Sequence, residues 1–240
     1  MPNDKSSKIK KINKKINTYK TKYESKKDLT NFREVKLGNI GENNIYRSYH
    51  PFKKSRPKHP LESKRIYTLK NLIKKNKINS IINLSDTNTN ILDEFNYYKK
   101  LYDQGKVIFI NKGYNHDVFY YITDTKNFAT LLKRIINFII KNPSPHLVHC
   151  RIGTDRTGVI IAILSAFMGA KWENIVLDYK RSNKLGIGEY RDEKLLKYAF
   201  QNLLNDYRFT NNLQNKINNY FINKVGLSNE LLTELKKQLK

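Results

Sequence analysis

The stretch 146–158, with the sequence HLVHCRIGTDRTG, contains the only cysteine of the 240-residue chain. Apolar residues lead up to Cys150, and a second apolar run covers residues 159–170. This pattern predicts a short buried strand over residues 146–150 and a buried helix over residues 159–170. The residues between them, as far as Arg156, therefore form a loop that leads from a strand into a helix.

A loop of this kind suits the binding of a phosphate group. Its backbone N–H groups can turn inward and form an anion-binding concavity at the N-terminus of the helix. The same positive field favours the thiolate form of Cys150. Arg156 supplies a planar fork that grips phosphate oxygens. Gly153 relieves crowding where the backbone approaches the ligand, and Gly158 allows the helix to pack closely. We therefore predict a thiolate nucleophile inside a phosphate-binding loop.

These residues resemble a known signature. The HCx5RTG pattern at 149–158 resembles the active-site loop of the protein tyrosine phosphatase superfamily. Its Gly-x-Asp-Arg-Thr-Gly ending is similar to that of bacterial members that act on phosphotyrosine proteins and sometimes on phosphoinositides. Two further segments, IYRSYHP at 45–51 and IINLSD at 81–86, resemble the pair of strands that comes before the catalytic loop in the sequence of small bacterial phosphatases. The resemblance extends over about residues 31–206.

Other interpretations of the lone cysteine are few. One is a buried structural cysteine beside a surface arginine. A nucleotide-type phosphate loop is excluded, because no Gly-Lys-Ser/Thr follows the first glycine at the required spacing. A single cysteine also excludes an intramolecular disulfide framework and a multi-cysteine zinc site. We expect no metal and no cofactor.

Hydrolysis also needs a proton donor for the leaving group. The resemblance implies an aspartate on a mobile loop roughly thirty residues before the cysteine, acting as general acid. Asp117, in the segment GYNHD at 113–117, occupies such a place, and His116 is either an orienting residue or a solvated loop histidine. Asp124 is the competitor, although its place just before Lys126 suits a helix N-cap. A different residue stays open as the third choice.

The resemblance also implies roles for the rest of the loop. His149 packs behind the thiolate, and Thr157 places its hydroxyl near the sulfur and helps it to leave. Asp155 either positions water or substrate, or forms an ion pair with Arg47 or Arg151. The lipid-preferring branch of the superfamily has a lysine at the position of Thr154, which argues against phosphoinositides unless Arg151 compensates. The predicted substrate-binding set is His149, Arg151, Ile152, Gly153, Thr154 and Asp155.

Three acidic positions outside the loop carry weaker signals. Asp86, at the end of a predicted strand, and Asp192 suit turn and helix-cap roles better than catalysis. The segment 178–183 has the pattern of a helix end near the active face, and we assign it no chemistry.

Strands alternate with helical patterns, which indicates an α/β fold. We expect a central sheet of about four to five strands, largely parallel, with helices on both faces. Strands are predicted over 34–37, 45–47, 80–84, 107–110 and 146–150. Helices are predicted over 61–77, 91–102, 126–141 and 159–170, a loop over 115–124, and helix from residue 171 to the end, with Ser228 as an N-cap.

We expect one phosphatase domain over residues 28–240, including a C-terminal helical extension over about 208–240. Residues 1–27 are rich in lysine and have little apolar periodicity, which predicts a flexible basic arm. The absence of an apolar leader favours a cytoplasmic protein, with export after removal of a signal peptide as the alternative. We also expect a monomer, and no run of residues is apolar enough to span a bilayer.

The net charge of +25 has two explanations. It attracts densely anionic partners, namely nucleic acid, an anionic membrane surface or a polyphosphorylated substrate. It also follows from the abundance of lysine, asparagine and isoleucine that an AT-rich coding sequence produces. The lysines are spread along the chain and form no dedicated nucleic-acid motif.

Together these features predict a cysteine-dependent phosphomonoester hydrolase that works through a phosphocysteine intermediate. Protein tyrosine or dual-specificity phosphatase activity is the first expectation, with a phosphorylated protein as substrate. The alternatives are a phosphoinositide or inositol polyphosphate phosphatase, an RNA 5′-triphosphatase, and a non-catalytic phosphate-binding module.

Overall fold

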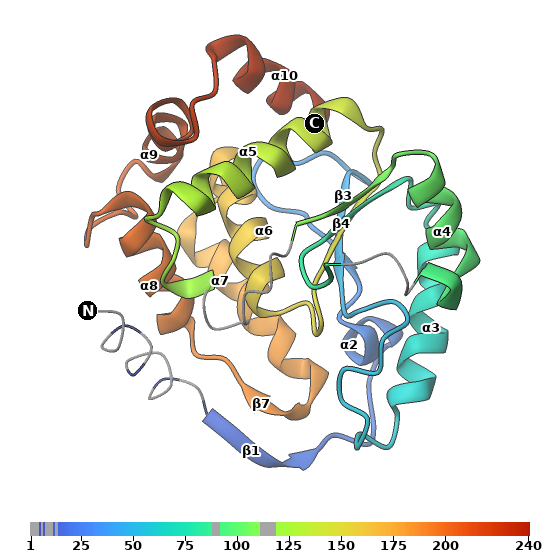
Figure 1. Ribbon diagram of the computed structural model, residues 1–240. Coiled ribbons are helices and arrows are strands. Elements are labelled where there is room, and N and C mark those ends of the chain that lie inside the picture. Colours follow the sequence, from blue (N-terminus) through green and yellow to red (C-terminus); the bar gives the residue numbers. More distant parts are fainter. Residues whose placement is uncertain (1–4, 6, 8–11, 13, 88–91, 111–118) are drawn as a thin grey trace.

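The core of the fold is a five-stranded sheet in the order β2-β3-β6-β4-β5, seen in a computed structural model (Figure 1) that describes residues 5, 7, 12, 14–87, 92–110 and 119–240. Strands β3, β6, β4 and β5 run parallel, and β2 lies antiparallel at one edge. This agrees with the predicted number and direction of strands. The strands are β2 (Arg33–Glu34), β3 (Ile45–Ser48), β4 (Ser80–Asn83), β5 (Val107–Phe109) and β6 (His146–His149).

Helices cover both faces of this sheet, as predicted, because successive strand side chains point to opposite sides. Ile82 and Val148 are buried in one apolar cluster, which contains residues of the helices from α5 (Lys126–Lys141) to α10 (Asn229–Leu239). Their neighbours Ile81 and Leu147 belong to the other cluster, together with residues of α3 (Glu62–Lys75) and α4 (Asn96–Asp103). Continuous apolar strands of this kind are typical of parallel sheets buried on both faces.

The helices before the anion-binding segment are α2 (Lys26–Thr30), α3 (Glu62–Lys75), the 3-10 turn η1 (Leu92–Glu94), α4 (Asn96–Asp103) and α5 (Lys126–Lys141). Those after it are α6 (Asp155–Phe167), α7 (Trp172–Arg181), the 3-10 turn η3 (Ser182–Leu185), α8 (Glu193–Leu204), α9 (Leu213–Tyr220), the π-helical turn η4 (Phe221–Val225) and α10 (Asn229–Leu239). Ser228 caps α10, as predicted, and Asp192 caps α8.

Helix α6 begins four residues earlier than the apolar pattern indicated. Residues 155–158 are polar or glycine, so only the run from Val159 onward carries an apolar signal, yet α6 already includes Asp155. Helix N-termini favour acidic residues, and this polar first turn is therefore consistent with a helix start. As a consequence Arg156 and Thr157 lie in the first turn of α6, directly beside the loop.

The prediction of helix from residue 171 to the end is wrong where a strand forms, and turns also interrupt the helices at residues 205–212. Residues 187–190 form strand β7 (Ile187–Tyr190), which pairs antiparallel with β1 (Lys14–Tyr19) in a separate two-stranded sheet (Figure 1). Residues 14–19 thus form a strand within the segment for which the sequence predicts a flexible arm. Neither strand has a strong local pattern, because the pairing joins segments far apart in the sequence.

Asp124 is not the N-cap of α5. That place belongs to Thr125, whose hydroxyl accepts a hydrogen bond from the Phe128 N–H at 3.2 Å. Asp124 forms an exposed ion pair with Lys5 at 3.0 Å. Threonine has the same capping chemistry as aspartate, so the sequence alone placed the cap one residue too early.

The register of the parallel strands determines where the polar residues meet. Ser48 and Asn83 both lie opposite His149, at the carboxyl ends of β3, β4 and β6. The chain segments that leave these three strands begin at Tyr49, Leu84 and Cys150, at the carboxyl ends of the strands. Open α/β sheets bind their ligands at this end of the strands.

Candidate active site

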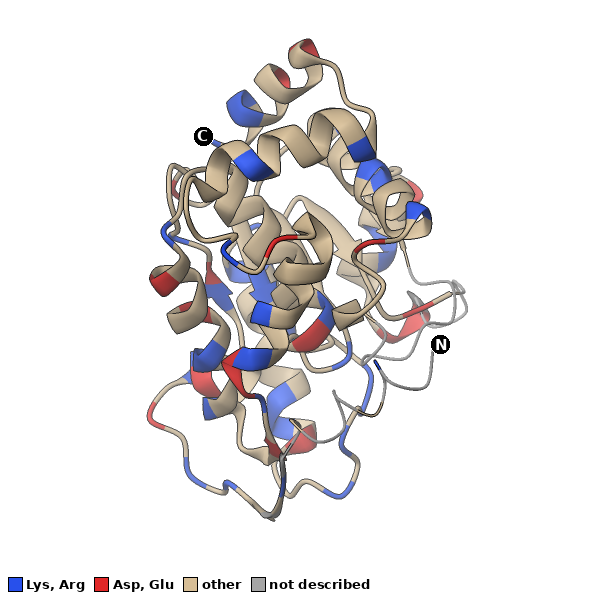
Figure 2. Ribbon diagram, turned by 90° about the vertical axis from the view of Figure 1, so that its left-hand side faces the viewer, with Lys and Arg blue, Asp and Glu red and all other residues tan. Residues whose placement is uncertain are grey.

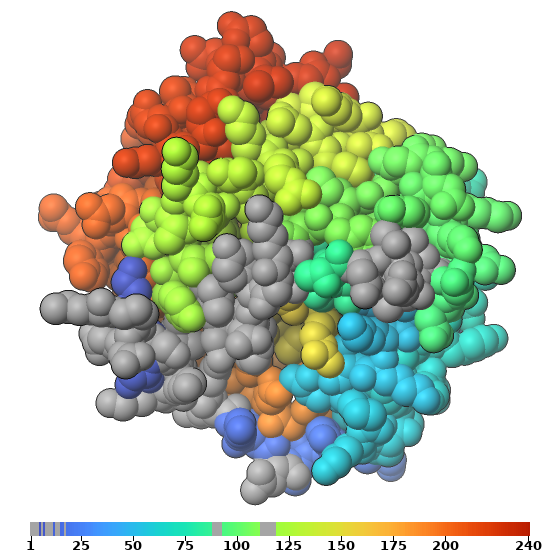
Figure 3. Space-filling view, in the orientation of Figure 1, coloured from blue at the N-terminus to red at the C-terminus, as the bar shows by residue number. Residues whose placement is uncertain are grey.

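The loop between β6 and α6 forms one wall of a small cavity of about 170 Å³. Atoms of this part of the chain, yellow in Figure 3, lie between the blue-to-cyan segment that follows β3 and the orange β7 region. Five residues that the sequence analysis singled out line this cavity, and the two others come from distant segments. The lining residues are Arg56, Cys150, Arg151, Ile152, Asp155, Arg156 and Arg191.

The loop backbone leaves its N–H groups available. The carbonyls of Arg151, Ile152 and Gly153 accept hydrogen bonds from the His50 N–H, the Asn31 side chain and the Arg47 guanidinium, at 3.2, 3.0 and 2.7 Å. By contrast, the N–H groups of residues 151–154 donate to no acceptor within the described part of the chain. Backbone N–H groups with no acceptor among the described residues can bind an anion, so this run marks a candidate anion site.

Gly153 allows the loop to turn at this place. Its φ of +73° lies in the left-handed region, and a Cβ atom added there would lie 2.1 Å from the backbone oxygen of Ser48. Only glycine combines this backbone conformation with so close an approach. The loop is therefore fixed against the end of β3.

Two buried arginines, Arg47 and Arg33, bind Asp178 and support the loop. Asp178 on α7 accepts a hydrogen bond from Arg47 and one from Arg33, both at 2.6 Å. Burial raises the pKa of Asp178, but the two guanidinium groups lower it more, and the net value is about 2. Burial, together with Arg47, lowers the pKa of Arg33 to about 10. Asp178 thus anchors the arginine that holds Gly153.

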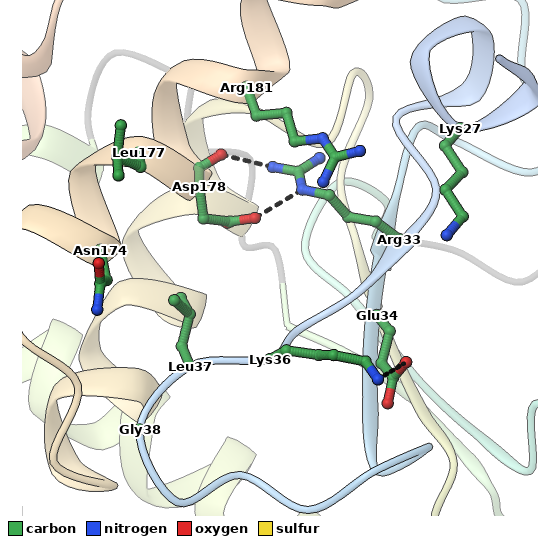
Figure 4. A pocket seen from close by; sticks show the side chains of 10 residues that line it. All are labelled: Lys27, Arg33, Glu34, Lys36, Leu37, Gly38, Asn174, Leu177, Asp178 and Arg181. Atoms are coloured by element: carbon green, nitrogen blue, oxygen red, sulfur yellow. Dashed lines mark hydrogen bonds and ion pairs between the residues drawn. The ribbon is translucent and has the colours of Figure 1, made fainter.

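Figure 4 shows the Arg33–Asp178 pair beside a second, larger cavity of about 550 Å³. Its rim carries Lys27, Lys36 and Arg181, and all three side chains are exposed. The described contacts of Arg33 are with Asn31, Asp178 and Ser182 inside the protein. We therefore assign the buried pair a supporting role.

Behind Cys150 a chain of hydrogen bonds fixes the ring of His149. The Asn83 amide donates to the Tyr98 hydroxyl at 3.0 Å, so the single Tyr98 proton points to His149 Nε2, also at 3.0 Å. His149 Nδ1 then carries the ring proton and faces the Cys150 carbonyl at 3.3 Å. Burial, followed by the neighbouring His50, lowers the pKa of His149 to about 3, so the ring is neutral.

A second buried pair adjoins this chain. The Nδ1 atom of His50 accepts the backbone N–H of Lys53 at 3.0 Å, so the proton lies on Nε2 and is donated to Asp86 at 2.7 Å. Asp86 therefore does more than cap a turn, the role expected from its position after β4. Burial raises the pKa of Asp86, but hydrogen bonds from His50 and Asn83 bring it below its ordinary value.

Asp155 forms an ion pair with Arg191, a partner that the sequence did not suggest. Its carboxylate accepts hydrogen bonds from Arg191 Nε and from the Tyr120 hydroxyl, both at 2.6 Å. Burial lowers the pKa of Arg191, but Asp155 raises it more, so the net pKa lies above the ordinary value. Arg191 follows β7, and the unexpected β1–β7 sheet therefore places this guanidinium in the cavity.

Sequence reasoning missed Arg56 and Arg191 as lining residues, and Tyr98 and His50 as partners of the loop. The segment GEYRD at 188–192 contains one signal for Arg191. Glu189 and Arg191 are two residues apart, so both side chains would lie on the same face if the segment were extended. Arg56 lies in an irregular segment that has no such pattern.

Two of the predicted catalytic side chains, Cys150 and Arg156, line the cavity, and Thr157 follows Arg156 in the first turn of α6. Cys150 is 2% exposed, and the Thr157 hydroxyl and Arg156 Nε are buried without a partner among the described residues. Asp117 lies outside the residues that the structure describes. Within those residues, no group of histidine, cysteine, aspartate or glutamate side chains is arranged to hold a metal ion.

The cavity thus combines a buried thiol, several guanidinium groups and loop amides that have no acceptor among the described residues, an arrangement suited to binding phosphate in a phosphatase. Comparison with known families agrees: the model of the tyrosine phosphatase family matches residues 27–240. The chain therefore belongs to the tyrosine phosphatase family. Comparison with curated proteins gives no match. No helix in the described ranges is long and apolar enough to cross a membrane.

Proposed function

We propose that the protein is a phosphotyrosine protein phosphatase that acts through a phosphocysteine intermediate on Cys150. The observation that carries the proposal is the loop itself, whose carbonyls are tied to the protein while the N–H groups of residues 151–154 have no described acceptor. A phosphate dianion would satisfy these donors. Arg156 lines the same cavity and provides the guanidinium that grips the equatorial oxygens.

The first step forms the covalent intermediate. The Cys150 sulfur attacks phosphorus, and the bond between phosphorus and the leaving oxygen breaks. Asp117 transfers its proton to that oxygen, so the dephosphorylated tyrosine departs as a neutral phenol. Asp155 is a poor alternative donor, because its oxygens accept hydrogen bonds from Arg191 and Tyr120.

The second step releases inorganic phosphate. Water attacks phosphorus and gives a proton to the Asp117 carboxylate, while the bond between phosphorus and sulfur breaks. The Thr157 hydroxyl, which has no other described partner, donates a hydrogen bond to the departing thiolate. The loop N–H groups and Arg156 stabilise the charge on the phosphoryl oxygens in both steps.

A phosphoinositide or inositol polyphosphate phosphatase is the second candidate function. It is favoured by Arg56, Arg151 and Arg191, which line the cavity in addition to Arg156. Such a lining suits a substrate that has more than one anionic group.

Turnover should require the thiol, whereas binding of the anion should not. Cys150→Ser is expected to abolish hydrolysis of phosphotyrosine peptide and still bind inorganic phosphate, because backbone N–H groups and Arg156 hold the anion. The assay compares phosphotyrosine peptide, phosphoserine peptide, a phosphoinositide and 5′-triphosphate RNA in EDTA. Vanadate and iodoacetate should block the wild type. Hydrolysis retained by the serine variant would exclude Cys150 as the nucleophile.

A further inference from the structure

The active-site cavity contains a second position that is suited to an anion, and a side chain of the protein occupies it. Glu189 on β7 bridges two of the lining arginines: one carboxylate oxygen lies 2.5 Å from Arg56 Nη2, and the other lies 2.6 Å from Arg191 Nη2. Each oxygen is thus within hydrogen-bonding distance of a different guanidinium. Because Arg56 and Arg191 line the same cavity as Cys150, this position adjoins the loop that receives the phosphate.

Both arginines keep other partners if the Glu189 side chain moves away. Arg191 stays bound to Asp155 at 2.6 Å, and its side chain is only 5% exposed. Arg56 Nη1 donates to the Ser55 carbonyl at 2.8 Å. The Glu189 side chain is itself 25% exposed, so it can rotate toward solvent. The guanidinium groups are therefore held in place independently of the carboxylate between them.

We propose that Arg56 and Arg191 form a subsite for a carboxylate of the substrate, and that Glu189 fills this subsite until the substrate displaces it. The inference rests on the proposed phosphotyrosine phosphatase activity and specifies its substrate: a phosphopeptide with an acidic residue next to the phosphotyrosine. The present occupant is a carboxylate bound to both arginines, which favours a carboxylate over a second phosphate. Glu189 thus competes with the substrate from within the protein.

The test compares two phosphotyrosine peptides that differ only in one neighbouring residue, glutamate or glutamine. Because both arginines can donate charge-assisted hydrogen bonds to the added carboxylate, wild-type kcat/KM should be roughly tenfold higher for the acidic peptide. Glu189→Gln should raise this ratio several-fold, since the internal competitor is weakened. Arg56→Gln should bring the ratio close to one.

Glu193→Gln is the matched control. It removes the same charge from α8, where Glu193 forms an exposed ion pair with Lys180 at 3.1 Å outside the cavity. This variant should leave both kcat/KM values as in the wild type, which shows that a change in net charge is not the cause. If instead it raises the ratio as much as Glu189→Gln does, long-range attraction explains the effect and the subsite is rejected.

Other outcomes separate the two proposals. Equal hydrolysis of both peptides by the wild type and by Glu189→Gln would overturn the subsite and leave the phosphatase activity intact. A loss of activity on both peptides in Glu189→Gln would make Glu189 a structural support of Arg191. Hydrolysis of a short-chain phosphoinositide bisphosphate, stimulated by Glu189→Gln, with no hydrolysis of either peptide, would overturn both the peptide activity and the carboxylate subsite.

Discussion

Asp155 directly follows the anion-binding loop, but its carboxylate is surrounded by hydrogen-bond donors and therefore acts as an acceptor of hydrogen bonds. Arg191 and Tyr120 both donate hydrogen bonds to its carboxylate, and the side chain is 1% exposed. Neutralising it would leave the buried Arg191 without part of its charge partner, which is costly. A proton donor for the leaving group therefore has to come from another residue, and Asp117 remains our proposal.

Asp117→Asn tests this assignment. General acid catalysis contributes roughly 10²–10⁴-fold, so kcat on an aryl phosphate with a poor leaving group should fall by about that factor. The loss should shrink with a leaving group that needs no proton. Asp124→Asn is the control, because Asp124 forms only an exposed ion pair with Lys5, and its kinetics should match the wild type. The opposite pattern in the two variants would make Asp124 the acid.

Tyr98→Phe tests the support of His149. The change removes the hydroxyl that donates to His149 Nε2 and leaves that buried nitrogen unpaired, at a cost of about 1–3 kcal/mol in the free energy of unfolding. We also expect kcat to fall more than KM changes, because the ring next to Cys150 loses its fixed orientation. Tyr97→Phe is the control: its hydroxyl binds the Ile78 carbonyl, outside the site, so it should leave kcat unchanged. Equal kcat in both variants would contradict the role of Tyr98.

At the scale of elements, the loop between β6 and α6 depends on its contact with β3. Gly153→Ala should place a Cβ atom against the Ser48 carbonyl, displace the loop and remove most activity. Gly105→Ala is a matched control, because Gly105 has nearly the same φ, +72°, and nothing within 4 Å of the added carbon. Gly105→Ala should therefore show only the left-handed backbone cost of about 1–2 kcal/mol.

Both glycine variants would be measured by denaturant unfolding and by kcat/KM on a phosphotyrosine peptide. The difference between them isolates the contact with β3 from the backbone strain. If Gly153→Ala loses no more stability and activity than Gly105→Ala, the loop does not depend on that contact.

The elements that could be predicted from sequence are those with a strong local pattern. An apolar run of a few residues predicts the buried strand β6, and helical periodicity predicts the amphipathic helix α5. Strands β1 and β7 do not, since each is defined only by its distant partner. The start of α6 was also hidden, because its first turn belongs to the polar loop motif.

The same distinction applies to the candidate site. Cys150 and Arg156 belong to one short motif, so their proximity follows from the sequence. His50 and Asp86 meet the loop only through the parallel register of β3, β4 and β6, which aligns the ends of those strands. The place of Arg191 in the cavity could be predicted only if strand β7 was known. Residues brought together by topology, and not by spacing along the chain, are therefore the ones that sequence analysis missed.

At the scale of the whole molecule, the positive charge is distributed. Figure 2 shows lysine and arginine on many helices and loops of the view, with acidic residues interspersed. In this view the basic residues are spread over the described helices and loops, and the lysines that give the net charge of +25 are likewise spread along the sequence. Attraction to anionic surfaces stays a prediction from the net charge, whereas we propose that the arginines of the cavity select the substrate.

Buried histidines make the stability of the whole molecule depend on pH. Burial lowers the pKa of His146 to about 4, and burial with His50 lowers that of His149 to about 3, against an ordinary value near 6.5. As the pH falls below about 6.5, these two histidines become protonated in the unfolded chain but stay neutral in the folded protein. The free energy of unfolding therefore falls as pH decreases from about 6.5, by roughly 1.4 kcal/mol per pH unit for each such histidine.

Urea unfolding at pH 7 and pH 5 checks this dependence. The wild type should lose about 2 kcal/mol for each of these two histidines over that interval. Asp86 and Asp178, whose pKa values are lowered, add their own loss only below about pH 4, so they do not contribute to the comparison. His146→Gln has one titrating group fewer and should show a correspondingly smaller loss. A wild type equally stable at both pH values would mean that these histidines are protonated in the folded protein.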